Sequence, residues 1–338
     1  GVLLSDMFHV TGIDKAAPHY DINLPFKVLQ VDVSDAKHME SLLKDFDAVV
    51  SALPYFLNIV LAQIAHDLGI HYFDLTEDVA STHFIKKLSK SSKAVMAPQC
   101  GLAPGFIGIV GSDLTHQYTK LRDIELRVGA LPRYPNGLLA YSFTWSPTGV
   151  INEYINDAEV IHNGKKKQVS SLDGLEYINI EGQEFEAFST SGGLGTMCET
   201  FEGRVDTLNY KTIRYPGHGK LMRFLMYELV MKEDLQQLEK ILTTAKPPVE
   251  EDLVHVYAVV EGIIDGEMRR KEFFQTYFPI EIHGKVWRAI SWTTAASLAA
   301  VVEMVASQTL PQKGFIKQEM ISLTDFYATT NGSLLQPK

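Results

Sequence analysis

Short apolar runs alternate with longer amphipathic stretches over the first hundred residues. The apolar runs are rich in β-branched residues, and those at 48–53 and 94–97 are almost wholly apolar, as strands covered on both faces should be. The predicted strands are 9–14, 26–33, 48–54, 71–76 and 93–99, and the predicted helices are 35–44, 57–68 and 79–89. Strands and helices that alternate at this spacing indicate βαβ units, so we predict an α/β domain built on a parallel sheet.

The pattern changes after residue 104, where longer strand-like runs replace the alternation. Asn163-Gly164 and Asp265-Gly266 each separate two such runs, and both dipeptides favour hairpin turns because they tolerate positive φ. The predicted strands are 122–130, 139–144, 158–161, 168–171, 184–190, 254–264 and 267–278, and the predicted helices are 105–118 and 293–308. This part therefore predicts an α+β region with an antiparallel sheet.

Composition narrows the class of protein. The 338 residues suggest two domains at about 150 residues each. The mean hydropathy is −0.02, so we expect neither a membrane protein nor a disordered one. The formal net charge of −10 argues against a nucleic-acid partner. With only Cys100 and Cys198, we expect no disulfide framework and a reducing cytoplasmic location.

The ends of the first predicted strands suggest a dinucleotide site. Asp14 ends a strand, where an acid can hydrogen-bond the ribose hydroxyls and repel a 2′-phosphate, so it favours NAD over NADP. Lys15 follows directly and weakens the preference for NAD. The alternative interpretation is that Asp14 is a surface aspartate that caps a loop. The residues that we expect to border the cofactor are Asp14, Asp32, Val33, Ala52, Leu53, Pro54 and Thr76.

A glycine-rich fingerprint should precede such an acid by about 20 residues. Only 13 positions separate Gly1 from Asp14, and they contain no such turn. We therefore expect the first strand and its glycine turn to lie upstream of residue 1.

Three acids lie close together at 74–78. Asp74, Glu77 and Asp78 lie at the end of a predicted strand, so they can receive a substrate ammonium, and Glu77 or Asp78 can act as a general base. The alternative is that Thr76 or Asp78 caps the helix that follows.

The segment 211–218 combines a guanidinium with a group that titrates near neutral pH. Arg214 can grip a carboxylate through two hydrogen bonds, His218 can exchange a proton, and Lys211 and Tyr215 are further candidates for substrate binding. The alternative is the end of a strand with Arg214 in a structural ion pair. Trp145 can wall an apolar pocket or pack in the core.

Other chemistry is poorly supported. The histidines show no His-x-x-x-His pair and no cysteine at metal-ligand spacing, so we predict no metal site. A buried packing role is favoured over nucleophilic catalysis for Cys100. The glycines at 192–195 follow antiparallel strands, which predicts a mobile loop over the cleft.

An ordered series of segments resembles the saccharopine dehydrogenase and lysine 6-dehydrogenase family. The series is Asp14 at a strand end, Ser-Ala-Leu-Pro at 51–54, Asp-Leu-Thr-Glu at 74–77, Cys-Gly-Leu-Ala-Pro-Gly at 100–105, Thr-Trp-Ser-Pro at 144–147, the hairpin at 159–165 and Arg-Tyr-Pro-Gly-His at 214–218. The resemblance extends over about residues 9–325.

The resemblance implies a Rossmann domain of residues 1–105 and 288–338, and a catalytic and dimerisation domain of residues 106–287. It implies an NAD(P)-dependent oxidoreductase, usually a homodimer, that transfers hydride from the amine-bearing carbon of an amino acid such as saccharopine or lysine. Arg214 would hold a substrate carboxylate, and Glu77, Asp78 or His218 would bind the amine or handle protons. A carboxynorspermidine-type imine reductase and a non-catalytic dimeric scaffold are the alternatives.

Overall fold

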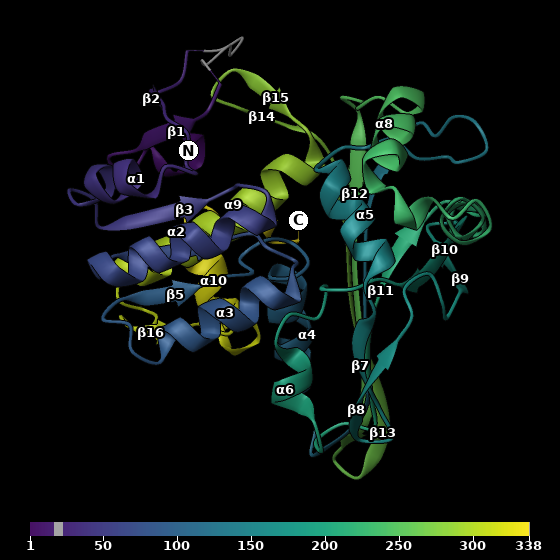
Figure 1. Ribbon diagram of the computed structural model, residues 1–338. Helices are drawn as coiled ribbons and strands as arrows, with labels where there is room; N and C mark the ends of the chain where they lie inside the picture. The colour runs from purple at the N-terminus through teal and green to yellow at the C-terminus, as the bar shows by residue number, and fades with distance from the viewer. Residues whose placement is uncertain (17–22, 338) are drawn as a thin grey trace.

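The computed structural model describes residues 1–16 and 23–337. Two regions lie side by side (Figure 1). One surrounds short parallel strands with helices, and the other is built on a long mixed sheet. The predicted fold class, a Rossmann-type parallel sheet joined to an α+β region, is confirmed.

The parallel strands form two separate sheets. β1 (Thr11–Asp14) pairs with β2 (Lys27–Gln30). The second sheet has the order β16-β5-β4-β3, with β3 (Ala48–Ser51), β4 (His71–Asp74), β5 (Val95–Ala97) and β16 (Gly314–Phe315). All five strands predicted in this region are present with shorter bounds. Ser51 pairs in register with Asp74, so β3 and β4 end at the same edge.

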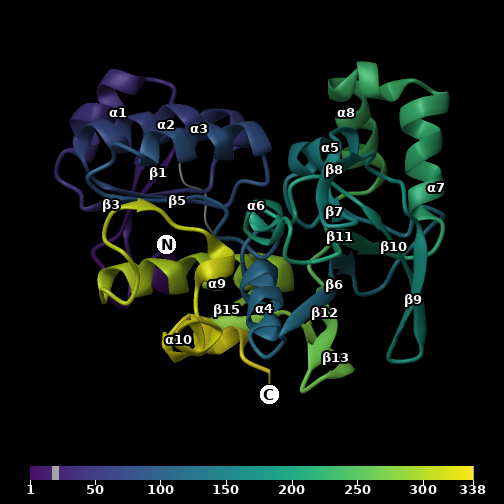
Figure 2. The same ribbon diagram turned by 90° about the horizontal axis from the view of Figure 1, so that it is seen from below.

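Three helices cover one face of these strands, and α9 and α10 lie on the opposite face (Figure 2). The three are α1 (Ala36–Leu43), α2 (Tyr55–Leu68) and α3 (Val79–Ser89). Local signals set their ends. The Asp35 and Asp78 carboxylates accept hydrogen bonds from the amides of His38 and Ser81, and Gly69 ends α2 at a φ of 72°.

The second region is an eight-stranded sheet. Its main order is β13-β12-β6-β11-β10-β9, and β7 pairs with β8 and with β11. The strands are β6 (Lys120–Pro132), β7 (Ala158–His162), β8 (Lys165–Val169), β9 (Glu176–Ile180), β10 (Gln183–Ser189), β11 (Thr207–Arg214), β12 (Asp252–Ile264) and β13 (Glu267–Tyr277). The prediction of a wholly antiparallel sheet needs one correction, because β11 pairs with β6 in parallel.

Both predicted hairpin turns are confirmed. Asn163 and Gly164 have φ values of 52° and 77° between β7 and β8, and Asp265 and Gly266 have 52° and 82° between β12 and β13. The predicted strand at 139–144 is wrong. Ala140 has a positive φ of 46°, and Tyr141 and Phe143 pack as a buried loop in an apolar cluster with residues of α5 and α8.

The other elements connect these sheets. The helices are α4 (Phe106–Thr115), α5 (Pro147–Ile155), α6 (Met197–Phe201), α7 (His218–Arg223), α8 (Leu235–Ala245), α9 (Ala289–Ala306) and α10 (Leu323–Ala328). A hairpin joins β14 (Ile280–Ile282) to β15 (Lys285–Trp287). Short 3-10 or π segments are η1 (Val2–Leu4), η2 (Phe224–Glu228), η3 (Met231–Glu233), η4 (Gln318–Met320) and η5 (Gly332–Leu335).

The C-terminal part of the chain packs against both regions. α9 contacts β12 of the mixed sheet and β4 of the parallel sheet, and β16 then pairs with β5. By length and composition alone α9 is apolar enough to cross a membrane, yet most of its residues are buried inside the protein. This burial is what a core helix requires.

Candidate active site

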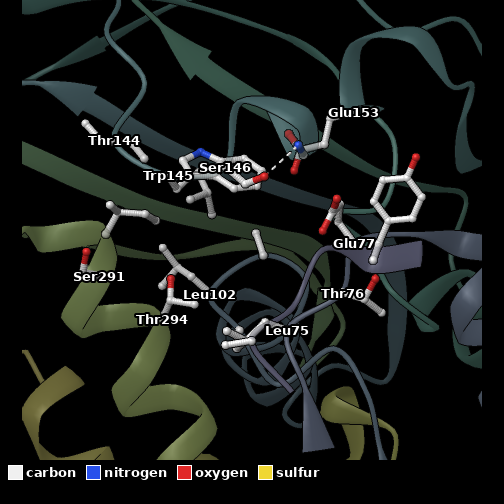
Figure 3. A pocket seen from close by; sticks show the side chains of 18 of the residues that line it. Leu75, Thr76, Glu77, Leu102, Thr144, Trp145, Ser146, Glu153, Ser291 and Thr294 are labelled. Carbon is white, nitrogen blue, oxygen red and sulfur yellow. Dashed lines mark hydrogen bonds between the residues drawn. The ribbon is translucent and has the colours of Figure 1, made fainter. Parts of the chain in front are cut away.

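A cavity of about 680 Å³ lies between the two regions. Residues that follow β3 and β4 form one wall, residues of β6 and β11 form another, and α5 and the start of α9 complete it. Figure 3 shows side chains from these elements converging on the cavity. In parallel α/β sheets, ligands bind at this carboxyl edge of the strands.

The wall after β3 and β4 is small and mostly apolar. Ala52, Leu53, Pro54 and Thr76 line it, so the structure brings together four of the residues predicted to border the cofactor. Asp74 holds the loop behind this wall. Its carboxylate accepts hydrogen bonds from the amides of Thr76 and Gln99 and from the Tyr72 hydroxyl, at 2.8 to 3.0 Å.

Asp14, Asp32 and Val33 do not line this cavity. They lie at and beyond the ends of β1 and β2, where Asp14 accepts a hydrogen bond from the Ala16 amide. The Lys15 ammonium lies 2.8 Å from the Asp32 carboxylate, and this hydrogen bond lowers the pKa of Asp32. Their contact with a cofactor stays a prediction.

Alternate residues of β11 face the cavity. Tyr210, Thr212 and Arg214 line it, as the two-residue repeat of a strand requires. Lys211 belongs to the other face of β11 and pairs with Glu176 at 2.5 Å. Tyr215 follows the strand, and its hydroxyl donates to the Pro132 carbonyl at 2.9 Å. The structure therefore places Lys211 and Tyr215, both predicted to bind substrate, outside the cavity lining.

Arg214 is held rigidly although it is only 3% exposed. Its Nε donates to the Tyr154 hydroxyl at 2.8 Å, and its Nη1 donates to the Ile213 carbonyl at 2.9 Å. The Tyr141 ring lies 4.7 Å from the guanidinium carbon. Among the described residues no carboxylate lies within ion-pair distance of Arg214, so the alternative of a structural ion pair finds no partner there.

His218 is linked to Arg214 through the Tyr154 hydroxyl. Its Nδ1 lies 3.0 Å from the Leu139 carbonyl and its Nε2 lies 3.1 Å from the Tyr154 hydroxyl. Burial, together with the nearby Arg214 charge, lowers the pKa of His218 to about 3. A neutral ring with its proton on Nδ1 accepts from Tyr154, which leaves the Tyr154 oxygen free to accept from Arg214. His218 itself does not line the cavity.

Two glutamates from different elements line the cavity. Glu77 comes from the loop after β4, and Glu153 comes from α5. Burial raises the pKa of Glu77 to about 7 and raises that of Glu153 well above its ordinary value. Asp78, the third predicted acid, does not line the cavity and caps α3, so the alternative reading of Asp78 as a helix cap is confirmed.

Trp145 lines the cavity and packs over the first turn of α5. That turn begins at Ser146, whose hydroxyl accepts a hydrogen bond from the Gly149 amide at 3.1 Å, as Figure 3 shows. A Cβ at Gly149 would lie 2.5 Å from the Trp145 ring, so this glycine makes room for the indole.

The turn at 192–195 is packed rather than loose. A Cβ at Gly192 would lie 2.3 Å from the Glu77 carbonyl oxygen, and a Cβ at Gly193 would lie 2.2 Å from the Tyr210 ring. The expected mobile loop is therefore replaced by a buried turn that contacts two residues of the site.

Sequence reasoning missed several cavity residues, namely Glu153, Tyr210, Thr212 and Arg288. The alternation that starts from Arg214 would have found Tyr210 and Thr212. Ser146 followed by Pro147 is a helix-start signal that would have placed Glu153 on a helix.

The residues of the first wall fit the nicotinamide end of a dinucleotide. Small apolar side chains and the Thr76 hydroxyl can contact a flat ring, and the opposite wall holds charged groups for a substrate. Within the described ranges, no group of three His, Cys, Asp or Glu side chains is arranged to hold a metal ion.

Comparisons with known proteins agree with this arrangement. Residues 101–335 match the family model described as the saccharopine dehydrogenase C-terminal domain, and residues 10–98 match the saccharopine dehydrogenase NADP binding domain. A saccharopine dehydrogenase (NADP⁺, L-glutamate-forming) of Saccharomyces cerevisiae is 25% identical over 232 residues, covering 63% of this chain and 50% of that protein. The alpha-aminoadipic semialdehyde synthase of Arabidopsis thaliana is 24% identical over 213 residues, covering 59% and 20%. The chain thus spans at most half the length of these curated relatives.

Two solved structures share the fold. The apo saccharopine dehydrogenase (L-Glu forming) of Saccharomyces cerevisiae aligns with a TM-score of 0.69 at 16% identity, covering 89% of this chain and 85% of that one. The homospermidine synthase of Legionella pneumophila in complex with NAD aligns with a TM-score of 0.63 at 13% identity, covering 98% and 85%.

Proposed function

Since the chain belongs to the saccharopine dehydrogenase family, we propose that it is an NAD(P)-dependent oxidoreductase that acts on the amine-bearing carbon of an amino acid. One observation carries the proposal. The Arg214 guanidinium and the carboxyl groups of Glu77 and Glu153 face one cavity, whose remaining wall fits a nicotinamide. A cation and carboxyl groups together suit a substrate that has both a carboxylate and an ammonium.

The proposed substrate is saccharopine or lysine. The Arg214 Nε donates its hydrogen bond to Tyr154, and N–H groups at the end of the guanidinium stay available to bind a carboxylate. Arg288, at the start of α9, can take a second carboxylate from the other side of the cavity. Trp145 can cover the aliphatic part of the substrate.

The bound nicotinamide would supply the hydride acceptor. The protein must remove a proton from the substrate ammonium, because hydride leaves readily only from a carbon that bears a neutral amine. Glu77 is suited to this, since its pKa of about 7 allows it to accept a proton at neutral pH. His218 and Asp78 then serve as positioning groups, through Tyr154 and through the cap of α3.

The choice between NAD and NADP is part of the proposal. The matched family model favours NADP by its description, and Asp14 favours NAD. The Lys15–Asp32 pair places both signs of charge beside the ends of β1 and β2. We therefore expect both cofactors to bind, and kcat/KM measured with each decides the preference.

The test is reduction of NAD⁺ or NADP⁺ by a panel of amino acids. Wild-type protein should give saturable absorbance of the reduced cofactor with saccharopine or lysine. If none of the amino acids in the panel reduces the cofactor, although calorimetry shows that the cofactor binds, the substrate assignment is overturned. The absence of any binding heat with either cofactor would instead favour the scaffold alternative.

A second candidate is an imine reductase that acts on a diamine. Two carboxyl groups in one cavity can bind the two ammonium ends of a diamine, and this observation favours it. Product analysis separates the candidates, because a diamine, an aldehyde and reduced cofactor would then form a secondary amine.

We also propose a homodimer in a reducing cytoplasm. The family resemblance implies the dimer, and the free, buried state of Cys100 and Cys198 suits a reducing compartment. Sedimentation equilibrium of purified protein tests the dimer, and fluorescence localisation in the source cell tests the compartment.

A further inference from the structure

Glu153 is an unusual residue for the wall of a cavity. It is 6% exposed, and none of the hydrogen bonds or ion pairs among the described residues involves its carboxyl oxygens, which open onto the cavity. An unpaired buried carboxylate costs free energy, whereas the neutral acid costs much less. The Glu153 carboxyl should therefore keep its proton.

Glu77 lies in a different environment, although it faces the same cavity. A hydrogen bond with Asn152 and its own backbone amide favour its charged form. Its main chain packs against Gly192 and its Oε1 lies near Gly149, so residues of the mixed-sheet region hold it in place. Glu77 can therefore ionise more readily than Glu153.

The two carboxyl groups point into the same end of the cavity (Figure 3). They are coupled, since the Glu77 charge adds to burial in raising the pKa of Glu153, while Arg214 opposes that rise. When two carboxyls share a site and their environments separate their ionisations, one serves as the base and the other as the acid.

From this geometry we infer, on the basis of the proposed function, that Glu77 is the general base and Glu153 the general acid of the reaction. The ionised Glu77 takes a proton from the substrate ammonium. The C–H hydride then leaves to the cofactor, and a C=N bond forms between the substrate carbon and its nitrogen. Glu77 passes its proton to solvent and takes a second proton from the water that adds to this carbon.

Glu153 completes the hydrolysis. It donates its proton to the carbinolamine nitrogen and recovers one from the carbinolamine hydroxyl as the C–N bond breaks and the carbonyl forms. Glu77 then protonates the released amine. Both carboxyls return to their starting states, one water is consumed and one net proton is released.

Other ionisable groups face the pair. These are Asp74, Asp78 and Tyr55 beside Glu77, and Arg214, Tyr141, Tyr154 and Tyr210 beside Glu153. Burial raises the pKa of each tyrosine, and arginine stays charged. Burial raises the pKa of Asp74 to about 6, but its carboxylate is hydrogen-bonded within its own loop and does not line the cavity. Among the residues that line the cavity, Glu77 and Glu153 are therefore the carboxyl groups that can exchange protons with a substrate.

Single-turnover and steady-state kinetics separate the two roles. Glu77→Gln should slow formation of reduced cofactor at least ~100-fold in both, because the proton must leave before hydride does. Glu153→Gln should form reduced cofactor in the single-turnover burst at a rate within about threefold of wild type. Its steady-state turnover should be ~100-fold slower than in wild type, because only hydrolysis then lacks its acid. Glu153→Asp should restore part of the turnover.

Glu184→Gln is the matched control, since this glutamate is exposed on β10 and does not line the cavity. It should behave like wild type. Equal slowing of burst and steady state by Glu153→Gln, or slowing of neither, overturns the inference. A wild-type protein without turnover on any amine overturns the proposed function instead.

Infrared titration gives a readout that needs no substrate. At a pH well above the Glu77 pKa of about 7, where Glu77 is ionised, wild-type protein should still show the carbonyl band of a buried carboxylic acid, and Glu153→Gln should lose it. In Glu77→Gln the band should titrate at lower pH, because the neighbouring charge is gone. A band that persists in Glu153→Gln contradicts the assignment even if that variant binds cofactor normally.

Discussion

Arg214 acquires its role from the groups that surround it. A guanidinium is always charged, and this one is buried beneath the Tyr141 ring with one nitrogen bonded to Tyr154. Tyr154 is bonded in turn to His218. In this hydrogen-bonded series, His218 fixes the position of Tyr154, and Tyr154 fixes that of Arg214. The free N–H groups of Arg214 therefore keep a defined direction toward the cavity.

Replacement of Arg214 by lysine should weaken substrate binding. The change keeps the charge, removes the planar fork and leaves the Tyr154 oxygen without its donor. We expect KM to rise at least ~10-fold, while the affinity for NAD(P)H stays within about twofold. Steady-state kinetics and cofactor titration measure the two effects, and an unchanged KM would remove Arg214 from the carboxylate site.

Protonation of Glu77 should make stability depend on pH. Its pKa rises from 4.5 to about 7 on folding, so between these values the native state binds more protons than the unfolded state. The free energy of unfolding should therefore fall with rising pH across this window, by up to ~1.4 kcal/mol per pH unit for one proton.

The Glu77→Gln variant checks this prediction. Urea denaturation from pH 5 to pH 7 should show a weaker decline than in wild type, because glutamine does not titrate. Parallel declines in the two proteins would mean that Glu77 titrates normally.

At the scale of single elements, a helix cap stabilises the helix that it begins. Asp78 caps α3 through the Ser81 amide, and its carboxylate is the acceptor. Asp78→Ala should lower the free energy of unfolding by about 1 kcal/mol, whereas Asp78→Asn should keep the cap. Urea denaturation of the two variants compares them, and equal losses would show that the charge, rather than the cap, stabilises the helix.

The start of α5 is shaped by Trp145. Gly149→Ala should destabilise the protein by about 1–3 kcal/mol and raise KM, because the added methyl displaces the indole from the cavity wall. Gly108→Ala in α4 is the control, since a Cβ there would meet the Met197 sulfur at an ordinary 3.5 Å. Thermal unfolding should separate the two, and equal effects would contradict a specific clash.

Pattern reasoning succeeded where an element depends on its own sequence. The strands and helices of residues 1–100 follow period and caps, and two dipeptides set hairpin turns. It failed at 139–144, where apolar residues are buried in a loop. For β11 it offered only a strand end near Arg214 as an alternative, without bounds, and the alternation along this strand decides that Tyr210 faces the cavity and Lys211 does not.

At the scale of the whole molecule, one apolar core crosses the boundary between the two regions. It contains Phe73 and Val95 from the parallel sheet, Leu126 and Val254 from the mixed sheet, and Ala296 from α9. An ion pair between Lys86 of α3 and Glu199 of α6 adds a polar link. Both regions should therefore depend on each other for stability.

We expect a single cooperative unfolding transition. Far-UV circular dichroism and tryptophan fluorescence should give coincident urea curves, because loss of either region exposes the shared core. Cofactor at 100 times its Kd should add about 2.7 kcal/mol to the free energy of unfolding. Two separated transitions would show that the regions fold independently.

The sequence by itself determined the α/β character of the first region, the hairpin turns, the helix caps and the ordered series of segments that identifies the family. These depend on residues that are close along the chain, so periodicity and turn chemistry are sufficient. Only the tertiary structure decided which groups meet. Glu77, Glu153 and Arg214 come from a loop, a helix and a strand far apart in sequence, and their burial in one cavity sets the charges and proton affinities on which the chemistry depends.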